Sequence, residues 1–167
     1  MTLNENAAIV LAALGRCALP HQFAIAGGYA RDLFFGVMPK DIDVVVVGHM
    51  DPSRLLDAMK EYGYTLECNN EASGNASVWN NVYQFSCPNK LDVDVLVSPQ
   101  SSVLEAINTF DCNLNQFILW NGEPSYLGGG NAVLRFIGSD VDDARRAYIE
   151  SKARDLGWIV PINPEKE

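Results

Sequence analysis

Hydrophobic and polar residues alternate along this chain in patterns that predict a succession of helices and strands. Apolar residues recur at helical spacing over 7–17, which predicts a first helix capped by Asn4 or Asn6 and ended by Pro20. The four valines at 44–47 are β-branched and too few for a buried helix, so they predict a strand. The same reasoning predicts strands at 22–26, 41–47, 64–68, 82–87, 91–97 and 115–120, and further helices at 29–35, 52–62, 99–110 and 141–156.

These elements predict a single α/β domain with a mixed sheet of about five strands flanked by helices. The length of 167 residues and the apolar content of 48% suit one packed core, which we assign to residues 1–160. Two prolines and three charges over 161–167 predict a flexible C-terminal tail. The apolar run at 7–14 falls well short of the roughly 20 residues that a membrane span requires, so no membrane partner is expected.

The charge and the cysteines narrow the possible functions. With a formal net charge of −9, the surface is not expected to bind nucleic acid broadly, because such binding uses Lys and Arg to neutralise phosphates. None of the four cysteines forms a Cys-x-x-Cys pair, which argues against a thiolate zinc site or a redox dithiol. Reduced thiols and a cytoplasmic location are therefore expected.

A candidate site for an anionic ligand lies at Gly27 and Gly28, between the predicted strand 22–26 and the predicted helix 29–35. Two glycines at such a turn let backbone N–H groups approach an anion, and the following helix directs its positive end to the same point. A Gly-Gly pair alone is more often a plain tight turn. The residues that follow the turn therefore decide between these interpretations.

Carboxylates begin the valine-rich strand that follows. Asp41 and Asp43 are two residues apart, so both side chains leave the same face of the strand, about 7 Å apart. Such a pair is ordinary at a solvated strand end, but before a buried strand it favours a hard cation such as Mg²⁺ or Mn²⁺. Asp92 and Asp94 repeat the arrangement, and either could supply a third carboxylate to a two-metal site, unless the pair lines a solvated edge strand.

Together these residues resemble a known family. The blocks AGGYARD at 26–32 and KDIDVVVV at 40–47 are similar to the catalytic head of the polymerase-beta-type nucleotidyltransferase superfamily, above all to CCA-adding enzymes and poly(A) polymerases. The block FDCNLN at 110–115 resembles their Arg-Asp-Phe-Thr-x-Asn motif, with Phe110 in place of the arginine. The blocks LRFIG at 134–138 and DDARR at 142–146 resemble the stretch that leads into their nucleotide-selecting Glu-Asp-x-x-Arg motif.

The resemblance implies a role for each matched residue. Asp41 and Asp43 would bind two Mg²⁺ or Mn²⁺ ions. Asp94 would be the third carboxylate, because Val95-Leu96-Val97 follows it as the family's strand does. Asp143 and Arg146 would face the base of an NTP. The complete set of residues that would bind the nucleotide is Gly27, Gly28, Arg31, Asp111, Asn115, Asp143 and Arg146.

Three functions fit these residues. The resemblance implies transfer of an NMP from an NTP to an acceptor hydroxyl with release of pyrophosphate, and the acceptor is either an RNA 3′ end or a protein or small molecule. The third possibility is a nucleotide-binding regulatory module without turnover, which acts through a partner. The clustered carboxylates favour an enzyme, because a binding module would not need three of them together.

Other conspicuous residues are expected to be structural. Apart from Arg146, the basic residues of the predicted helix 141–156, Arg145 among them, are expected to form a solvated face. The three tryptophans do not alternate with basic residues, so packing in the core or at its rim is expected rather than base stacking.

Overall fold

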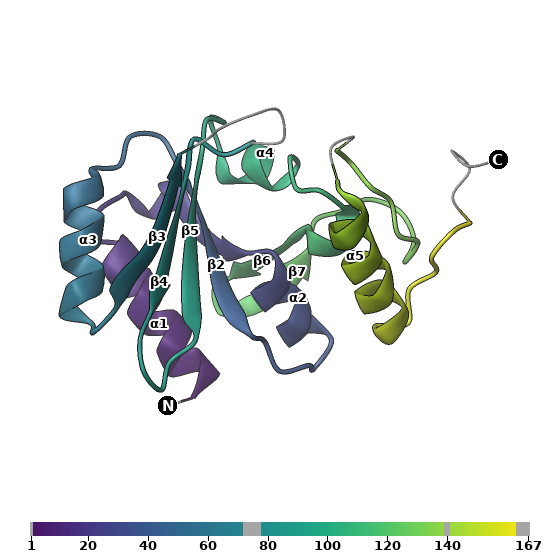
Figure 1. Ribbon diagram of the computed structural model, residues 1–167, viewed down its shortest axis with the longest axis horizontal. Coiled ribbons are helices and arrows are strands. Elements are labelled where there is room, and N and C mark those ends of the chain that lie inside the picture. Colours follow the sequence, from purple (N-terminus) through teal and green to yellow (C-terminus); the bar gives the residue numbers. More distant parts are fainter. Residues whose placement is uncertain (1, 72–77, 139–140, 163–167) are drawn as a thin grey trace.

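The computed structural model describes residues 2–71, 78–138 and 141–162, which form a mixed β-sheet flanked by helices (Figure 1). Within these residues seven strands lie in the order β3-β4-β5-β2-β1-β6-β7. The central strands β2 and β5 are parallel, and the other neighbouring pairs are antiparallel. The strands are β1 (Phe23–Ala26), β2 (Asp41–Val47), β3 (Thr65–Glu71), β4 (Asn81–Ser86), β5 (Asp92–Ser98), β6 (Phe117–Trp120) and β7 (Glu123–Tyr126).

The alternating side chains of β2 and β5 give the centre of the sheet two unlike faces. Every second residue points to one face, where the residues are apolar and packed into the main core. The intervening residues point to the other face and begin with aspartates in register, Asp41 opposite Asp92 and Asp43 opposite Asp94. The fully buried residues of the apolar face are Ile42, Val44, Val46, Val93 and Val95.

Two helices cover the apolar face. α1 (Leu3–Leu14) and α3 (Pro52–Glu61) lie side by side and on the same side of the sheet (Figure 1). Their buried side chains, including Leu14, Leu55 and Met59, join the valines of β2 and β5 in one cluster. Burying each such side chain stabilises the fold by roughly 1.5–3 kcal/mol, so this layer holds the central strands firmly.

The opposite face is covered in part by α4 (Val103–Ile107). This helix packs with Val45 and Val47 at the C-terminal end of β2. The N-terminal end of β2, which carries Asp41 and Asp43, instead lines a cavity. The sheet face is therefore divided between a small apolar cluster and an open acidic region.

A third layer closes the end of the molecule that lies opposite α3 (Figure 1). α2 (Gly28–Phe34) follows β1, and α5 (Asp143–Asp155) joins it in a separate buried cluster that includes Ile149 and Ala153. Two short 3₁₀ turns, η1 (Pro20–Gln22) and η2 (Asn113–Asn115), precede β1 and β6. Side chains of α2, η2 and α5 reach the cavity from this end.

The sheet is larger than expected, with seven strands rather than about five. β6 corresponds to the strand predicted at 115–120, whereas β7 has no predicted counterpart. The two form a hairpin that joins the rest of the sheet through one residue pair, Ala26 with Ile118. β7 is an edge strand of four residues that includes Pro124, so its strand pattern in the sequence is weak.

Two predicted helices differ from the observed ones. The first helix is capped by Thr2, not by Asn4 or Asn6, since Thr2 and Glu5 form a reciprocal capping box. The helix predicted at 99–110 is reduced to Val103–Ile107, because the Ser102 hydroxyl accepts the N–H of Glu105 and sets a later start.

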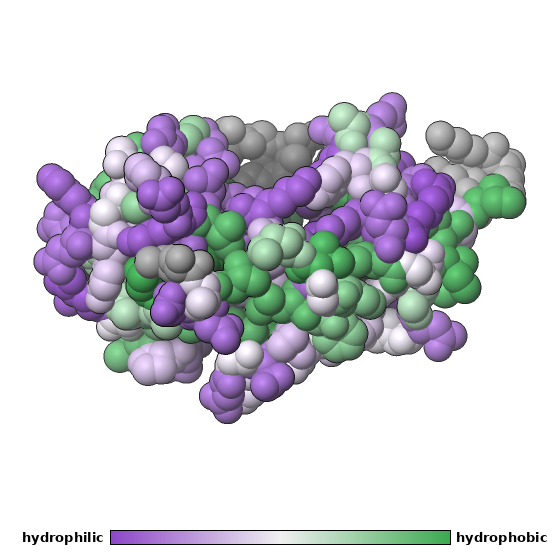
Figure 2. Space-filling model, turned by 90° about the horizontal axis from the view of Figure 1, so that it is seen from below, coloured by the Kyte–Doolittle hydropathy of each residue, from purple (hydrophilic) through white to green (hydrophobic). Residues whose placement is uncertain are grey.

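The remaining surface features are simple. The underside of the molecule carries hydrophobic residues across its middle and hydrophilic residues at the α3 end (Figure 2).

Within the described ranges no helix has the length and apolar character needed to cross a bilayer. All four cysteines are free thiols. Most of the predicted tail, 163–167, lies outside the described residues.

Candidate active site

The turn between β1 and α2 lies directly against the aspartates. Gly27 has a φ of 74°, in the left-handed region that favours glycine, and its N–H donates to the carbonyl of Phe117 at 2.9 Å. A Cβ at position 27 would stand 3.3 Å from Oδ2 of Asp43. A side chain would therefore strain the backbone and crowd the carboxylate, so both the turn and the cavity favour glycine here.

Three carboxylates from two neighbouring strands line one cavity of about 510 Å³. Asp43 and Asp94 are direct neighbours in the parallel register of β2 and β5, on backbones about 4.8 Å apart. Asp41 lies two residues before Asp43 and shares the cavity. Asp92 is exposed and does not line it. Of the two candidates for a third carboxylate, the structure thus brings Asp94 to the other two.

The surroundings of these carboxylates oppose their ionisation. Burial, followed by the charges of Asp41 and Asp94, raises the pKa of Asp43 to about 8. Burial, followed by the charges of Asp41 and Asp92, raises the pKa of Asp94 to about 6. The pKa of Asp41 is also raised, mainly by burial. A cation bound among the three side chains would remove this cost by favouring the ionised forms.

The donor set fits a hard divalent cation. In the described part of the chain, no group of three or more Asp, Glu, His or Cys side chains is arranged so that it could hold a metal ion by itself. Mg²⁺ keeps several waters and usually takes one or two carboxylates together with substrate phosphates, so an open acidic wall is what it requires. Asp41, Asp43 and Asp94 offer such a wall, to which substrate phosphates would add the remaining ligands.

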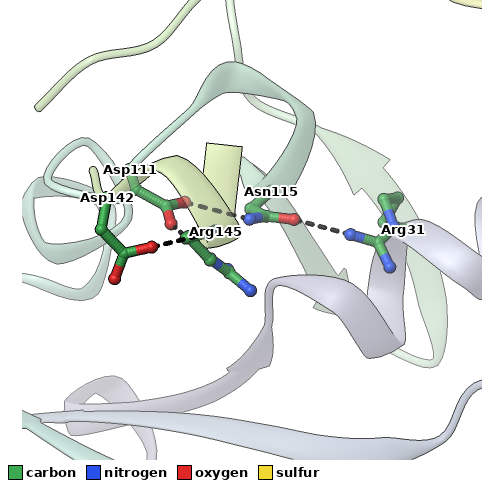
Figure 3. A network of polar contacts seen from close by, with 5 residues as sticks. All are labelled: Arg31, Asp111, Asn115, Asp142 and Arg145. Carbon is green, nitrogen blue, oxygen red and sulfur yellow. Dashed lines mark hydrogen bonds and ion pairs between the residues drawn. The ribbon is translucent and has the colours of Figure 1, made fainter. Parts of the chain in front are cut away.

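A chain of polar contacts forms another wall of the cavity (Figure 3). The buried Arg31 donates from Nε to Asp32 at 2.9 Å and from Nη1 to Oδ1 of Asn115 at 2.7 Å. Asn115 donates to Asp111 at 3.1 Å, and Asp111 accepts from Nε of Arg145 at 2.9 Å. Because these polar groups satisfy one another, the chain holds Arg31 and Asn115 in fixed orientations.

Helix α5 is tied to this wall at both ends. Asp142 caps the helix by accepting the backbone N–H of Arg145 at 2.7 Å, beside the Arg145–Asp111 ion pair (Figure 3). Two turns further along, Nζ of Lys152 lies 3.3 Å from Oδ1 of Asp32. The position of α5 therefore depends on Asp111 and Asp142, which line the cavity, and on Asp32, which accepts from the cavity residue Arg31.

The structure brings most of the predicted site residues together and leaves two apart. Asp143 is exposed, and Arg146 places its guanidinium carbon 4.1 Å from the centre of the Phe136 ring. Neither lines the cavity, whereas Asp142, Arg145 and Tyr148 do. The eight predicted residues that share the cavity are Gly27, Gly28, Arg31, Asp41, Asp43, Asp94, Asp111 and Asn115.

The two arginines are distinguished by their contacts and not by the phase of α5. Ile149 and Ala153 are the buried residues of the helix, so they mark its inward face. Arg145 lies four residues and Arg146 three residues before Ile149, so both positions flank that face. Arg146 packs on the Phe136 ring, whereas Arg145 is exposed, as expected, and reaches the cavity through its ion pair with Asp111.

An apolar wall completes the cavity. It is formed by Val78, Trp79, Leu96 and Phe110. The rings of Trp79 and Phe110 lie 5.7 Å apart, and Phe110, in the position where the resemblance expects arginine, is 7% exposed. Trp79 thus packs at the rim of a core cluster, as expected, but it also borders the candidate site.

Comparisons with known proteins identify the fold. No family model and no curated protein matches the sequence. Among solved structures, a CCA-adding enzyme in its apo form I matches with a TM-score of 0.64 and 17% identity, over 98% of this chain and 40% of that one. The Thermotoga maritima CCA-adding enzyme complexed with tRNA matches with a TM-score of 0.63 and 17% identity, over 98% and 40%. The Bacillus stearothermophilus CCA-adding enzyme in complex with CTP gives 0.63 and 15%, over 99% and 43%.

This chain spans less than half the length of those three structures. At identities of 15–17% the likeness establishes the fold. The resemblance indicated by the blocks at 26–32 and 40–47 is confirmed at that level: the protein has the α/β nucleotidyltransferase fold that is found in CCA-adding enzymes.

Proposed function

We propose that this protein is a Mg²⁺- or Mn²⁺-dependent nucleotidyltransferase, which moves an NMP from an NTP to an acceptor hydroxyl. The observation that carries the proposal is the convergence of Asp41, Asp43 and Asp94 on one cavity beside the Gly27–Gly28 turn. Gathering three carboxylates costs stability when no cation is present, as the raised pKa values of all three show. Phosphoryl transfer with two metal ions requires such a group of carboxylates, whereas nucleotide binding alone does not.

The similar structures support the identity of the substrates. One CCA-adding enzyme is complexed with tRNA and another with CTP, and a tRNA nucleotidyltransferase is complexed with a primer tRNA and an incoming ATP analogue. By likeness, an NTP is the donor here and an RNA 3′ end is the favoured acceptor. A protein or small molecule remains the second candidate, because the net charge of −9 does not favour broad contact with RNA.

The aspartates and the glycine turn would act on the triphosphate. Asp41, Asp43 and Asp94 would hold the ions, which when bound neutralise the triphosphate and lower the pKa of the acceptor hydroxyl. Gly27 leaves room for the phosphates to approach Asp43. Arg31 places Nη2 3.4 Å from the Cβ position of Gly28, so its charge lies beneath the turn where the phosphates would bind. The acceptor oxygen bonds to the α-phosphorus as the bond to the pyrophosphate oxygen breaks, and the hydroxyl proton leaves to solvent.

Arg145 and Asp142 would face the base. Asp111 fixes the Arg145 guanidinium through Nε, and the terminal nitrogens of an arginine are paired donors suited to a base edge. The Asp142 carboxylate adds an acceptor next to it. This pair takes the role that the sequence resemblance gave to Asp143 and Arg146.

Transfer of label tests the proposal. The protein is incubated with each α-labelled NTP and Mg²⁺ in the presence of total RNA, or of an RNA-free extract of proteins and small molecules, and Asp43→Asn serves as the control. We expect label to appear in one acceptor fraction with wild-type protein and not with the variant. Equal labelling by both proteins, or none by wild type in either fraction, would count against nucleotidyl transfer.

A further inference from the structure

A buried cluster of three charged side chains lies behind the cavity. Oδ1 of Asp32 accepts from Nε of Arg31 at 2.9 Å, and Nζ of Lys152 lies 3.3 Å from the same oxygen. The side chains of Arg31, Asp32 and Lys152 are 7%, 6% and 16% exposed. Arg31 lines the cavity, whereas Asp32 and Lys152 are not among the described residues that do so. An influence of Lys152 on the cavity therefore passes through Asp32 and Arg31.

The contacts of Arg31 leave one corner of its guanidinium beside the glycine turn. Nε is held by Asp32, and Nη1 donates to Oδ1 of Asn115 at 2.7 Å. Nη2 is the atom nearest to the Cβ position of Gly28, at 3.4 Å. Because two corners are fixed by partners on either side, the third is held where the triphosphate would bind.

The charges of the three side chains do not cancel. Arg31 and Asp32 form an ion pair without net charge, which alone would attract a triphosphate only weakly. Lys152 adds a second cation, so the cluster keeps one net positive charge. Charges so far from water are weakly screened and act over longer distances. The charge of Asp32 does reach the cavity: after burial, it is the largest cause of the raised pKa of Asp41, and Arg31 opposes it.

We propose that Lys152 is a positioning residue for the triphosphate, which pairs with Asp32 and so leaves the positive charge of Arg31 uncompensated at the glycine turn. The inference rests on the proposed nucleotidyl transfer, which places the triphosphate there. Lys152 and Arg145 lie on the same helix but act on different parts of the nucleotide. Since all four NTPs carry the same triphosphate, Lys152 affects them equally, whereas Arg145 affects their order.

Binding of the four NTPs and of inorganic tripolyphosphate, each with Mg²⁺, to the full chain tests the proposal. Lys152→Met keeps a long side chain and removes its charge, and we expect it to weaken all five ligands about tenfold. KM for the NTP should rise while kcat changes little, because the interaction is already present in the bound substrate. Lys152→Arg keeps the charge and should retain most of the affinity. Arg154→Met removes the same charge from the same helix at a side chain that is 62% exposed, and should keep the affinity within about twofold.

A double variant separates the charge of Lys152 from a role in anchoring α5. In Asp32→Asn/Lys152→Met the amide oxygen at position 32 still accepts from Arg31, and Arg31 is left as one uncompensated cation, as in wild type. We expect it to bind tripolyphosphate more tightly than Lys152→Met and within about threefold of wild type. If Lys152 only anchors the helix, the double variant should bind no better than the single one, since both lack the ion pair. Where Lys152→Met alone does not fold, a tenfold loss in the double variant overturns the proposal.

The outcomes separate this inference from the proposed function. Unchanged affinity in Lys152→Met, an equal loss in Arg154→Met, or an altered order of the four NTPs in Lys152→Met would overturn the role of Lys152. So would a double variant that binds no better than the single one. As long as wild type binds NTP, these results leave the proposed nucleotidyl transfer standing. If neither NTP nor tripolyphosphate binds wild type in the presence of Mg²⁺, both are contradicted.

Discussion

The two faces of the β2–β5 pair share one backbone but differ in their side chains, which are apolar on one face and acidic on the other. On one face, Val44 and Val95 are fully buried and pack with α1 and α3 in the main core. On the other face, Asp43 and Asp94 are direct neighbours and carry raised pKa values. Burial of apolar side chains on one face stabilises the fold, whereas the gathering of carboxylates on the other face lowers the stability of the fold.

The difference shows how a strand of seven residues encodes stability and chemistry together. Because side chains alternate, a change at position 43 and a change at position 44 act on opposite sides of one sheet. If the two faces are separable, activity and stability should respond independently to mutation. Each prediction below probes that separation.

The largest effect is expected on activity from the acidic face. Asp43→Asn keeps the shape of the side chain and removes its charge, and kcat/KM for NMP transfer should fall by more than about a hundredfold. The melting temperature without metal should hold or rise. Since the folded-state pKa of Asp43 is raised from 3.8 to about 8, ionised Asp43 costs stability, and that cost grows as pH rises between those values. Steady-state kinetics measures the activity, and calorimetry in EDTA measures the melting temperature. An active Asp43→Asn would contradict the assignment of catalysis to the acidic face.

The complementary change lies on the core face. Val44→Ala removes two buried methyl groups and should lower the free energy of unfolding by about 2 kcal/mol. Below its melting temperature the variant should keep kcat within about threefold of wild type, since loss of core packing weakens the fold without touching the carboxylates. Urea unfolding and a kinetic assay at low temperature provide the measurements. A loss of activity as large as that of Asp43→Asn would mean that the two faces are not independent.

Divalent metal should offset the cost of the acidic face. At a hundred times its dissociation constant, Mg²⁺ should add about 2.7 kcal/mol of stability by mass action, and an NTP should add more. The raised melting temperature should be absent in Asp43→Asn and retained in Val44→Ala. Thermal unfolding with and without millimolar MgCl₂ or MnCl₂ provides the readout. An equal shift in both variants would place the ion elsewhere.

A smaller effect is expected at α5, where two adjacent arginines differ in their contacts. Arg145→Ala should change the relative affinities for ATP, CTP, GTP and UTP. Arg146→Ala removes the contact with Phe136 and should leave their order unaltered, at a stability cost of about 0.5–1 kcal/mol. Titration of the four nucleotides against both variants makes the comparison. The reverse pattern would restore the assignment that the sequence resemblance suggested.

Local features of the sequence predicted the central part of this molecule well. The spacing of Asp41 and Asp43 within a β-branched strand is enough to place them on one face, and the resemblance selected Asp94 from the second pair of aspartates. The glycine turn lies one residue beyond the end of β1. Such features depend on residues that are close in sequence. The α/β class and the resemblance follow from the same short blocks.

Features that depend on long-range contacts were missed. The side chain of Asp111 meets Arg145 34 positions further along, and that contact cannot be inferred from a local pattern. Arg146 packs on the ring of Phe136, which lies outside α5. The Trp79 wall likewise forms only when β4 is placed beside β5. The types of the secondary-structure elements were therefore easier to predict than the directions in which individual side chains point.

We infer that the carboxylates that share the cavity, and not acidic residues in general, carry out the transfer. Asp92 and Asp94 offer a matched pair on one strand, since Asp94 lines the cavity and Asp92 is exposed. The most direct measurement is transfer of α-labelled NMP by Asp94→Asn and by Asp92→Asn, each over a titration of Mg²⁺. We expect a loss of more than about a hundredfold for Asp94→Asn, because a metal-binding carboxylate is removed. Asp92→Asn should keep activity within about twofold of wild type, as for an ordinary surface change. Full activity in Asp94→Asn, or equal losses in both variants, would show that the cavity carboxylates do not carry out the transfer.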